Sequence, residues 1–366
     1  MRARAPGRVA SIEEDRPDVQ RVVVDTAAGA RRAVVYPALT GRAQVGDCVT
    51  LNTWAVELGL GTGGVDFVVE IHRADEVSAD PPGHIMKLRY TPHQLPVLAA
   101  EAQESPHHDA VAGFTSLDTT PVVCAELHSQ IAPICAAAKC ETRGKARIAY
   151  VMTDEAALPI AFSRLVGSLV DRGLIDATVT VGQAFGGNYE AINLYSGLAV
   201  ARVVARADII VVSQGPGGAG TGTPLGFSGV GQGVALNAAA ALNGTPIAVA
   251  RLSFADARVR HFGLSHHTVT VLERIAMSPA LVPLPRLPDE QRRYLARSIE
   301  RRELAEAHEF VTVDAEAGLA ALADSGVRVQ TMGRAPAEDR VFFLAASAAG
   351  LLAGQWVERT VGGRPR

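Results

Sequence analysis

A glycine-rich stretch is the first part of this 366-residue sequence with a composition suited to chemistry. Nine of the 19 residues from 215 to 233 are glycine. Because glycine has no side chain, the backbone N–H groups of such a loop can approach a phosphate or carboxylate closely. We therefore predict that the loop binds an anion through Gly215, Gly217, Gly218, Gly220 and Gly222. A flexible lid or a close-packed crossover is the alternative interpretation.

The same stretch formally contains the GxGxxG pattern of dinucleotide-binding proteins, at Gly215, Gly217 and Gly220. Its context fits poorly, because Pro216 and Pro224 interrupt the turn and the next helical pattern begins only near residue 229. No GK[ST] sequence follows, which excludes the phosphate loop of P-loop NTPases. The pattern therefore neither predicts nor excludes a nucleotide cofactor.

Two adjacent histidines, His266 and His267, are the second feature. Ser265 is a typical helix N-cap and apolar residues follow at helical spacing, so the pair is predicted to lie in the first turn of a helix. A helix N-terminus disfavours imidazolium, which leaves neutral rings that can act as a general base or a metal ligand. Arg258 and Arg260 lie just upstream and are predicted to clamp an anion. In the alternative interpretation, one ring caps a carbonyl and the other lies on the surface.

Polar residues that follow predicted strands complete the candidate site. Glu126 and Asp154 join His266 and His267 as candidate catalytic residues, and Asn188 is a candidate ligand-binding residue. His128 is a candidate metal ligand together with His266 and His267. None of these has a diagnostic metal-binding spacing such as HExxH, so a divalent metal is left open as a cofactor.

An alternation of strands and helices after residue 112 must position these groups. It predicts an α/β domain over residues 113–366 with a doubly wound, mostly parallel sheet in a Rossmann-like three-layer arrangement. In such sheets, ligands bind beyond the carboxyl ends of the strands, where the strand order reverses. One predicted helix runs from a cap at Asn188 to Val203. The predicted strands cover residues 121–127, 147–152, 178–181, 208–213, 246–250, 310–313 and 327–330.

The N-terminal part of the chain has a different pattern of predicted elements. Residues 1–83 contain five short strand patterns separated by turns, which predicts a small β-barrel-like domain. This segment carries nine arginines, no lysine and twelve acidic residues, a net charge of −3, so nucleic acid is not its expected partner. A packing or oligomerisation module is the expected role, and a homo-oligomer is left open. Residues 84–112 are predicted to be a connector that contains four of the ten histidines.

The composition of the whole chain excludes several classes of protein. With 48% apolar and 20% charged residues the chain is an ordinary globular one, and 35 basic against 38 acidic residues give no footprint for nucleic acid or a membrane surface. The first residues lack the apolar stretch of a signal peptide, and the four cysteines lack disulfide-like spacing, which together predict a cytoplasmic protein. The uncharged run Val341–Val357 is short for a membrane span, so a buried terminal helix is expected.

Several segments together resemble one known family. They are residues 36–41, 56–64, 83–92, 215–226 and 263–268. The sequence resembles a family of actinobacteria and other Gram-positive bacteria that is catalogued only as a domain of unknown function. The resemblance covers essentially the whole chain and implies that the barrel, the connector and the α/β domain occur as one bacterial unit. It implies no activity, cofactor or catalytic residue.

Three functions remain as hypotheses. The leading one is a small-molecule enzyme that binds an anionic metabolite, bearing phosphate or carboxylate, at the carboxyl edge of the α/β sheet. The second is a non-catalytic ligand-binding sensor or scaffold, and the third is an NAD(P)- or flavin-dependent oxidoreductase. A sensor needs only the amides and arginines, whereas an enzyme needs two or more titratable side chains that converge on one cavity.

Overall fold

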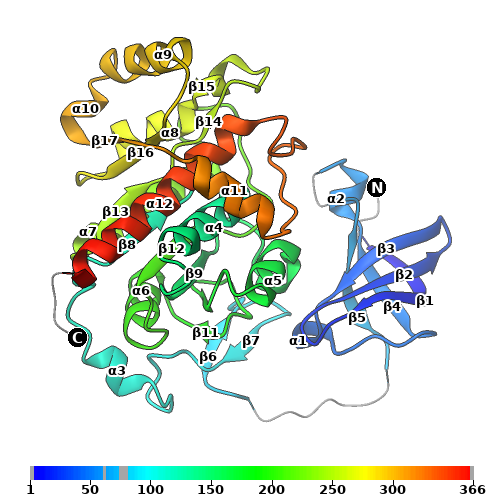
Figure 1. Ribbon diagram of the computed structural model, residues 1–366. Coiled ribbons are helices and arrows are strands. Elements are labelled where there is room, and N and C mark those ends of the chain that lie inside the picture. The colour runs from blue at the N-terminus through cyan, green and yellow to red at the C-terminus, as the bar shows by residue number, and fades with distance from the viewer. Residues whose placement is uncertain (1–3, 61–62, 74–80, 363–366) are drawn as a thin grey trace. The chain divides into compact units, whose positions relative to one another are not determined.

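Alternating apolar residues near the N-terminus build a closed five-stranded barrel with strand order β1-β2-β3-β5-β4 (Figure 1). Val22 and Val24 of the second strand point into its core and are fully buried, while Val23 between them is not. This is the period-two pattern expected of a strand with one buried face. The predicted β-barrel is thereby confirmed. Its elements are β1 (Arg4–Asp15), β2 (Gln20–Thr26), β3 (Gly29–Val35), α1 (Pro37–Thr40), β4 (Cys48–Asn52), α2 (Trp54–Glu57) and β5 (Asp66–Ile71).

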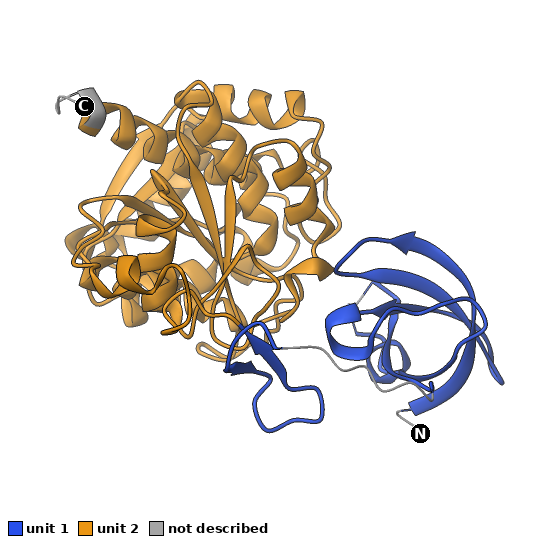
Figure 2. Cartoon of the chain, turned by 90° about the horizontal axis from the view of Figure 1, so that it is seen from below, with its two compact units in different colours: residues 1–97 blue, residues 98–366 orange. Residues whose placement is uncertain are grey.

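The structure, a computed structural model, describes residues 4–60, 63–73 and 81–362. Two residues of the family-like segment 56–64, Gly61 and Thr62, lie outside that range. Backbone contacts divide the chain into two compact units, residues 1–97 and 98–366 (Figure 2). The predicted connector contributes a small antiparallel hairpin to the first unit and a short helix to the second. These elements are β6 (Ile85–Lys87), β7 (Leu95–Val97) and α3 (His108–Ala112).

The second unit is organised by one eight-stranded sheet in which every pair of neighbours is parallel. The strand order is β11-β10-β9-β12-β8-β13-β16-β17. From β8 the chain first builds outwards on one side, then returns through β12 and continues through β13 on the other side, so the order reverses around β8. The strands are β8 (Pro121–Cys124), β9 (Ile148–Thr153), β10 (Ala177–Thr180), β11 (Tyr189–Glu190), β12 (Ile209–Gln214), β13 (Thr245–Ala248), β16 (Leu281–Pro285) and β17 (Glu309–Val313).

Helices cover both faces of this sheet, because alternate residues of each central strand enter different cores. Val123 and Val211 pack in one core, whereas Val122 and Val212 pack in the other. This confirms the predicted three-layer α/β arrangement. Helices of the first core are α4 (Ile131–Glu141), α5 (Arg164–Asp171), α11 (Glu316–Asp324) and α12 (Arg340–Gly362). Helices of the second are α6 (Leu194–Val203), α7 (Gly231–Ala241), α8 (His266–Thr270), α9 (Asp289–Glu300) and α10 (Leu304–Ala307).

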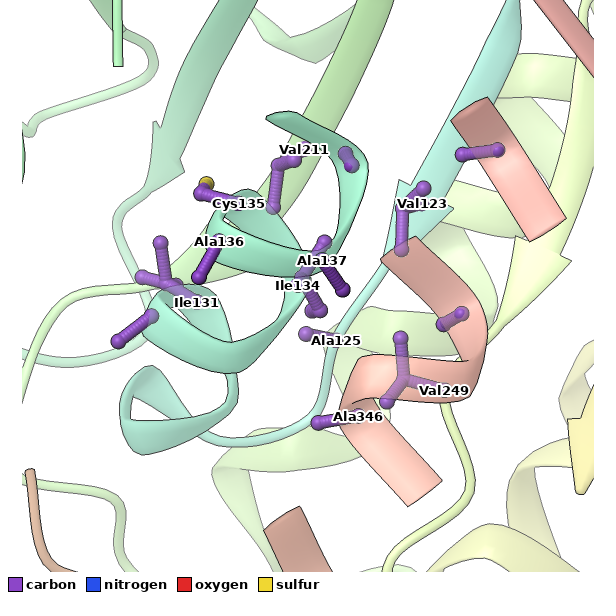
Figure 3. Close-up of a cluster of buried hydrophobic side chains, with 14 of the residues drawn as sticks. Val123, Ala125, Ile131, Ile134, Cys135, Ala136, Ala137, Val211, Val249 and Ala346 are labelled. Atoms are coloured by element: carbon purple, nitrogen blue, oxygen red, sulfur yellow. The ribbon is translucent and has the colours of Figure 1, made fainter. Parts of the chain in front are cut away.

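The long terminal helix α12 packs against α4, and small residues let the two helices approach closely. Figure 3 shows Ile134 and Ala137 of α4 near Ala346 of α12 within one apolar cluster. A Cβ at Gly350 would lie 2.1 Å from the Ile134 carbonyl oxygen, so this contact requires glycine. By length and composition α12 is the one helix among the described residues that could cross a membrane, but 78% of its apolar window is buried. That burial is typical of a core helix.

One predicted strand of the sheet was wrong, and the observed strand β16 was not predicted. Residues 327–330 form no strand, although Val327 and Val329 are buried in the first core. Their alternation is satisfied by side-chain packing, without a neighbouring strand to pair with. Conversely, β16 escaped prediction because Pro283 and Pro285 lack the N–H that a central strand needs. The two prolines are tolerated because β16 pairs with β13 only at Leu281 within the described residues.

The predicted start of helix α6 was also wrong. Residues 189 and 190 pair with β10 as the short edge strand β11, so the helix cannot begin at Asn188. Asn193 is the N-cap instead, and its side chain accepts a hydrogen bond from the Ser196 backbone N–H at 3.1 Å. Both asparagines are good cap residues, and strand pairing decided between them.

Candidate functional site

The candidate site lies at the carboxyl ends of three neighbouring central strands, β12, β8 and β13. Gln214 is the last residue of β12, Glu126 follows β8 by two residues, and Arg251 follows β13 by three. The strand order reverses at this point, and side chains that follow the strands converge there without interrupting the sheet. A topological switch point is where open parallel sheets bind ligands.

A buried carboxylate, Glu126, is the centre of the site. The residue is 1% exposed, and its Oε1 accepts hydrogen bonds from Arg251 Nη1 at 3.0 Å and from His267 Nδ1 at 2.5 Å. Arg251 is itself only 6% exposed. The second carboxylate oxygen of Glu126, Oε2, is buried and has no hydrogen-bond partner among the residues that the structure describes. The carboxylate therefore retains an acceptor position beyond the two contacts of Oε1.

The charge of Glu126 determines how His267 carries its proton. Burial opposes ionisation of the carboxyl, but the hydrogen bond from His267 and the charge of Arg251 outweigh it, and the pKa of Glu126 is below its ordinary value. Arg251 Nη1 also lies 3.2 Å from His267 Nδ1, but the contact with Glu126 is shorter and an ionised carboxylate can only accept, so Nδ1–H is assigned as the donor. In that tautomer the lone pair of the ring is on Nε2. The ring is held in place by Phe227, which stacks on it at 3.8 Å between centroids and 4° between planes. The result is an oriented imidazole.

A short antiparallel pair brings His267 next to Arg251. β14 (Leu252–Ser253) pairs with β15 (Gly263–Leu264), and the Ser265 backbone N–H then donates to the Arg251 carbonyl at 2.9 Å. Ser265 is the N-cap of α8, and its Oγ accepts from the His267 backbone N–H at 3.2 Å. The predicted cap and the predicted position of the two histidines in the first turn are therefore present. The cap fixes the backbone that carries the imidazole.

Three histidine rings gather at this helix start. One ring nitrogen of each of His261, His266 and His267 lies within 4.8 Å of the others. Burial lowers the pKa of His261 to about 3, with further contributions from the charges of Arg251 and Arg258, and burial and the neighbouring His267 lower the pKa of His266. These two rings are therefore neutral near pH 7. Neutral imidazoles are acceptors and metal ligands.

A cavity of about 210 Å³ opens beside these side chains. Gly218, Gly220 and Gly222 line it, and so do Glu126 and His267. The glycine loop folds back on itself through other residues: Thr221 N–H donates to the Gly226 carbonyl, and Ser228 N–H donates to the Ala219 carbonyl. The cavity is also lined by Leu127, Gln214, Ala219, Ser228, Gly229, Arg251, Arg258, Arg260, His261 and Met332.

Gly229 gives Glu126 its space. A Cβ at this position would lie 2.4 Å from Glu126 Cγ, closer than any real contact. The turn η3 (Ser228–Val230) carries this glycine and leads into α7 at Gly231. Because α7 starts well beyond Gly220, the loop does not open directly into a helix, as a dinucleotide fingerprint requires. The geometry therefore differs from that of a Rossmann nucleotide site.

The two upstream arginines have different roles. Arg258 donates to both carboxylate oxygens of the buried Asp256, at 2.9 and 2.6 Å, and its charge is thereby compensated. Arg260 is exposed, and its Nε donates to His261 Nε2 at 3.4 Å. Both line the cavity, but Arg260 is the one that carries a charge without an acid bonded to it among the described contacts. An anion in the cavity would meet Arg260 first.

Residues 32–350 match the family described as "Protein of unknown function (DUF3866)". The chain belongs to this family. The match takes in the barrel from within β3 onwards, the hairpin β6–β7 and nearly the whole α/β unit, so the candidate site lies entirely inside the family's shared sequence. No curated protein matches the chain in sequence.

Three predicted site residues do not join the cluster. Asn188 Oδ1 accepts from the backbone and the hydroxyl of Thr178 and so anchors the edge strand. Asp154 is exposed, and it accepts from the Gln183 backbone N–H at 2.8 Å, which stabilises the turn after β10. His128 bonds the Gln214 carbonyl through Nδ1 at 3.2 Å and Ser163 Oγ through Nε2 at 2.6 Å. Both of its nitrogens have protein partners, so it is not available as a metal ligand.

Two of the predicted glycines lie in a neighbouring hollow. Gly215 and Gly217 line a second cavity of about 320 Å³ together with His128, while Gly218 lines both cavities. A Cβ at Gly215 would lie 2.5 Å from the Ala157 carbonyl oxygen, so close packing explains this glycine. Gly217 has a φ of +100° and serves the turn.

Three members of the site were absent from the sequence prediction. Arg251 is 125 positions from its partner Glu126, and Phe227 is 40 positions from the ring that it covers. No local sequence pattern predicts either contact. His261 was the most accessible to prediction, since it lies five residues before His266 in the same segment as the two arginines. Their convergence depends on the β14–β15 pair and the sheet order.

Proposed function

We propose that this protein is an enzyme that binds a small anionic metabolite in the 210 Å³ cavity and uses the Glu126–His267 pair as its reactive centre. One observation carries the proposal: a buried, ionised carboxylate holds an oriented imidazole at the wall of the cavity that the glycine loop lines. Burying a carboxylate is costly, and such arrangements concentrate at functional sites.

The convergence of titratable groups favours an enzyme over a sensor. Glu126, His261 and His267 all line one cavity, whereas a sensor would need only the loop amides and a cation. The pair places a lone pair of His267 beside the cavity, and Glu126 stabilises positive charge that develops on the ring. A lone pair held this way can take a proton from a bound substrate or coordinate a metal ion.

Charge and size favour a small anion as the substrate. Glu126 compensates Arg251 and Asp256 compensates Arg258, so Arg260 supplies the remaining positive charge. Drug-sized ligands occupy pockets of about 300–1,000 Å³, so this cavity suits a smaller molecule that carries a phosphate or carboxylate group. The described cysteines are all free, which supports a reducing compartment, and we propose the cytoplasm as the place of action.

Thermal unfolding in the presence of inorganic phosphate, and of a panel of phosphorylated and carboxylated metabolites, tests the proposal. We expect the wild type to be stabilised in a concentration-dependent way. In R260A the apparent affinity for the same compound should be at least tenfold lower. The matched control is R293A, an exposed arginine on α9. Equal stabilisation of the wild type and R260A by every compound would remove the anion site.

Catalysis requires a second readout, because binding alone would also fit a sensor. Each panel compound is incubated with the protein, and its consumption is followed by mass spectrometry. We expect one compound to be consumed by the wild type, and the rate to fall at least a hundredfold in H267Q with binding retained. Binding without consumption of any compound would favour the non-catalytic sensor.

A further inference from the structure

The three-histidine cluster has features that a general base does not need. A base requires one oriented ring, which Glu126 and His267 already form. Yet two more rings, His261 and His266, each place a nitrogen within 4.8 Å of a nitrogen of His267. We propose that His261, His266 and His267 bind a divalent transition-metal ion, with zinc as the type case.

Hydrogen bonds hold the Nδ1 atom of two of the rings. His267 Nδ1 bonds Glu126, and His261 Nδ1 bonds Ser265 Oγ at 2.8 Å. Metal-binding histidines usually coordinate through one nitrogen and donate the other N–H to a carboxylate or another acceptor, which fixes the ring. Glu126 and Ser265 occupy those supporting positions. His267 Nε2 is therefore available to a metal. His261 Nε2 accepts from Arg260 Nε at 3.4 Å and becomes available when this exposed side chain moves away, whereas both partners of His128 are buried.

His266 adds an independent observation. Its Nε2 is buried and has no hydrogen-bond partner in the part of the chain that the structure describes. An unsatisfied buried polar atom of this kind destabilises the fold and calls for an explanation. A metal ion bound by the cluster would remove this cost. The same explanation covers the presence of three histidine rings at one helix start.

The three ring nitrogens are almost close enough to bind one ion. Zn–N bonds are about 2.0–2.1 Å, so tetrahedral ligand atoms lie about 3.4 Å apart. Ring nitrogens within 4.8 Å of one another reach that spacing when side-chain rotations move them by on the order of 1 Å. Arg260 is exposed and can release His261 Nε2, which it contacts at 3.4 Å.

Three histidines leave one coordination position for water or substrate, as in catalytic zinc sites. The net charge selects what occupies it. With Arg251 and Arg258 compensated by acids, the metal and Arg260 together favour an anion. This part of the inference rests on the proposed function, since an oxygen of the anionic substrate would occupy the open coordination position. The metal site itself stands on the histidines alone.

Titration of untagged, metal-free protein with Co²⁺ and Zn²⁺ tests the site. We expect one equivalent of Co²⁺ to bind with the visible absorption of a four-coordinate nitrogen site, and Zn²⁺ to displace it. H266A/H267A should lose this spectrum, whereas H107A/H108A, the other adjacent histidine pair, should keep it. E126Q should bind about 10- to 100-fold more weakly, because it alters the support of one ligand without removing the ligand.

The outcomes separate the two proposals. No metal bound at 100 μM, or an unchanged spectrum in H266A/H267A, would overturn the metal site whatever the result with phosphate. Circular dichroism of each variant excludes unfolding as the cause of a lost spectrum, and H266Q provides a milder variant. Phosphate binding that depends on Arg260 without any metal would keep the anion site alone. Metal binding without any effect of phosphate would keep the histidine site alone.

Discussion

Two histidines near the same edge of the sheet, His128 and His267, have opposite environments. Both nitrogens of His128 are bonded to protein groups, the Gln214 carbonyl and Ser163 Oγ. One nitrogen of His267 is held by a buried carboxylate, and the ring lies next to the rings of His261 and His266. A histidine becomes a structural group when its hydrogen-bonding capacity is used up. It becomes a candidate for chemistry when one nitrogen is fixed and the other remains available.

The support of the two rings differs just as much. His128 is held by neutral partners, and burial lowers its pKa to about 4. His267 is held by an ionised group that is itself held by Arg251. Burying a pair of charges costs desolvation free energy, and removing one partner then leaves the other charge unpaired. A buried charged pair is therefore stronger evidence of function than of a gain in stability. Four predictions follow from this difference.

The largest effect is expected for E126A. The substitution leaves Arg251, 6% exposed, without its carboxylate, and a buried charge without a partner costs about 3–5 kcal/mol of unfolding free energy. Urea unfolding measures it. The exposed pair Asp289–Arg292 is the control, since D289A should lose less than about 1 kcal/mol. A loss in E126A as small as in D289A would contradict the charged support of His267.

G229A should have the next largest effect. The added Cβ would clash with Glu126 Cγ and displace the carboxylate, at a cost of about 1–3 kcal/mol. Phosphate binding should weaken with it. G220A is the control, because its nearest contact would be 3.7 Å away and its φ is not positive. If both variants unfold at the same urea concentration, Gly229 has no role in seating Glu126.

S163A tests the structural histidine. Ser163 caps α5 by accepting from the Val166 N–H, and it also bonds His128. Its loss removes a cap and leaves His128 Nε2 without that partner, so we expect about 2 kcal/mol of destabilisation. N193A, which removes only the cap of α6, should lose about 1 kcal/mol. Metal and phosphate binding should not change in S163A, and a large change in either would erase the distinction between the two histidines.

The last effect is a pH dependence, which is the smallest of the four at neutral pH because it vanishes there and grows only in acid. The pKa of His128 is about 4 in the folded protein against an ordinary 6.5, so between these values the unfolded state binds more protons. The free energy of unfolding should therefore fall as the pH drops from about 6.5 to 4. In H128Q this contribution is absent, and stability measured against pH should be flatter over that range. Parallel curves would show that His128 is not buried in its neutral form.

Local patterns were sufficient for much of the architecture. Short strand patterns separated by turns predicted the barrel, and apolar runs with intervening helical stripes predicted the parallel three-layer sheet. These patterns reflect burial of one face or of both, which each segment carries in its own residues. The failures occurred where pairing overrode the local signal, at Asn188, at residues 327–330 and at the proline-containing strand β16.

The candidate site was predictable in part. Ser265, His266 and His267 form a local cap, so their conformation could be derived from neighbouring residues. The position of Asp154 after a strand looked equivalent to that of Glu126, yet only Glu126 follows the central strand at the switch point. Sequence position after a strand does not reveal the order of the strands in the sheet, and that order decides which side chains meet.

By itself, the sequence determined the two kinds of architecture, the glycine loop and the helix cap that carries the imidazoles, because each depends on residues within a few positions of one another. Only the tertiary structure decided that Glu126 meets Arg251 and His267, across 125 and 141 positions, and that His261 joins the ring cluster in place of His128. Such contacts depend on strand order and on which polar groups are already satisfied, and both are properties of the folded whole.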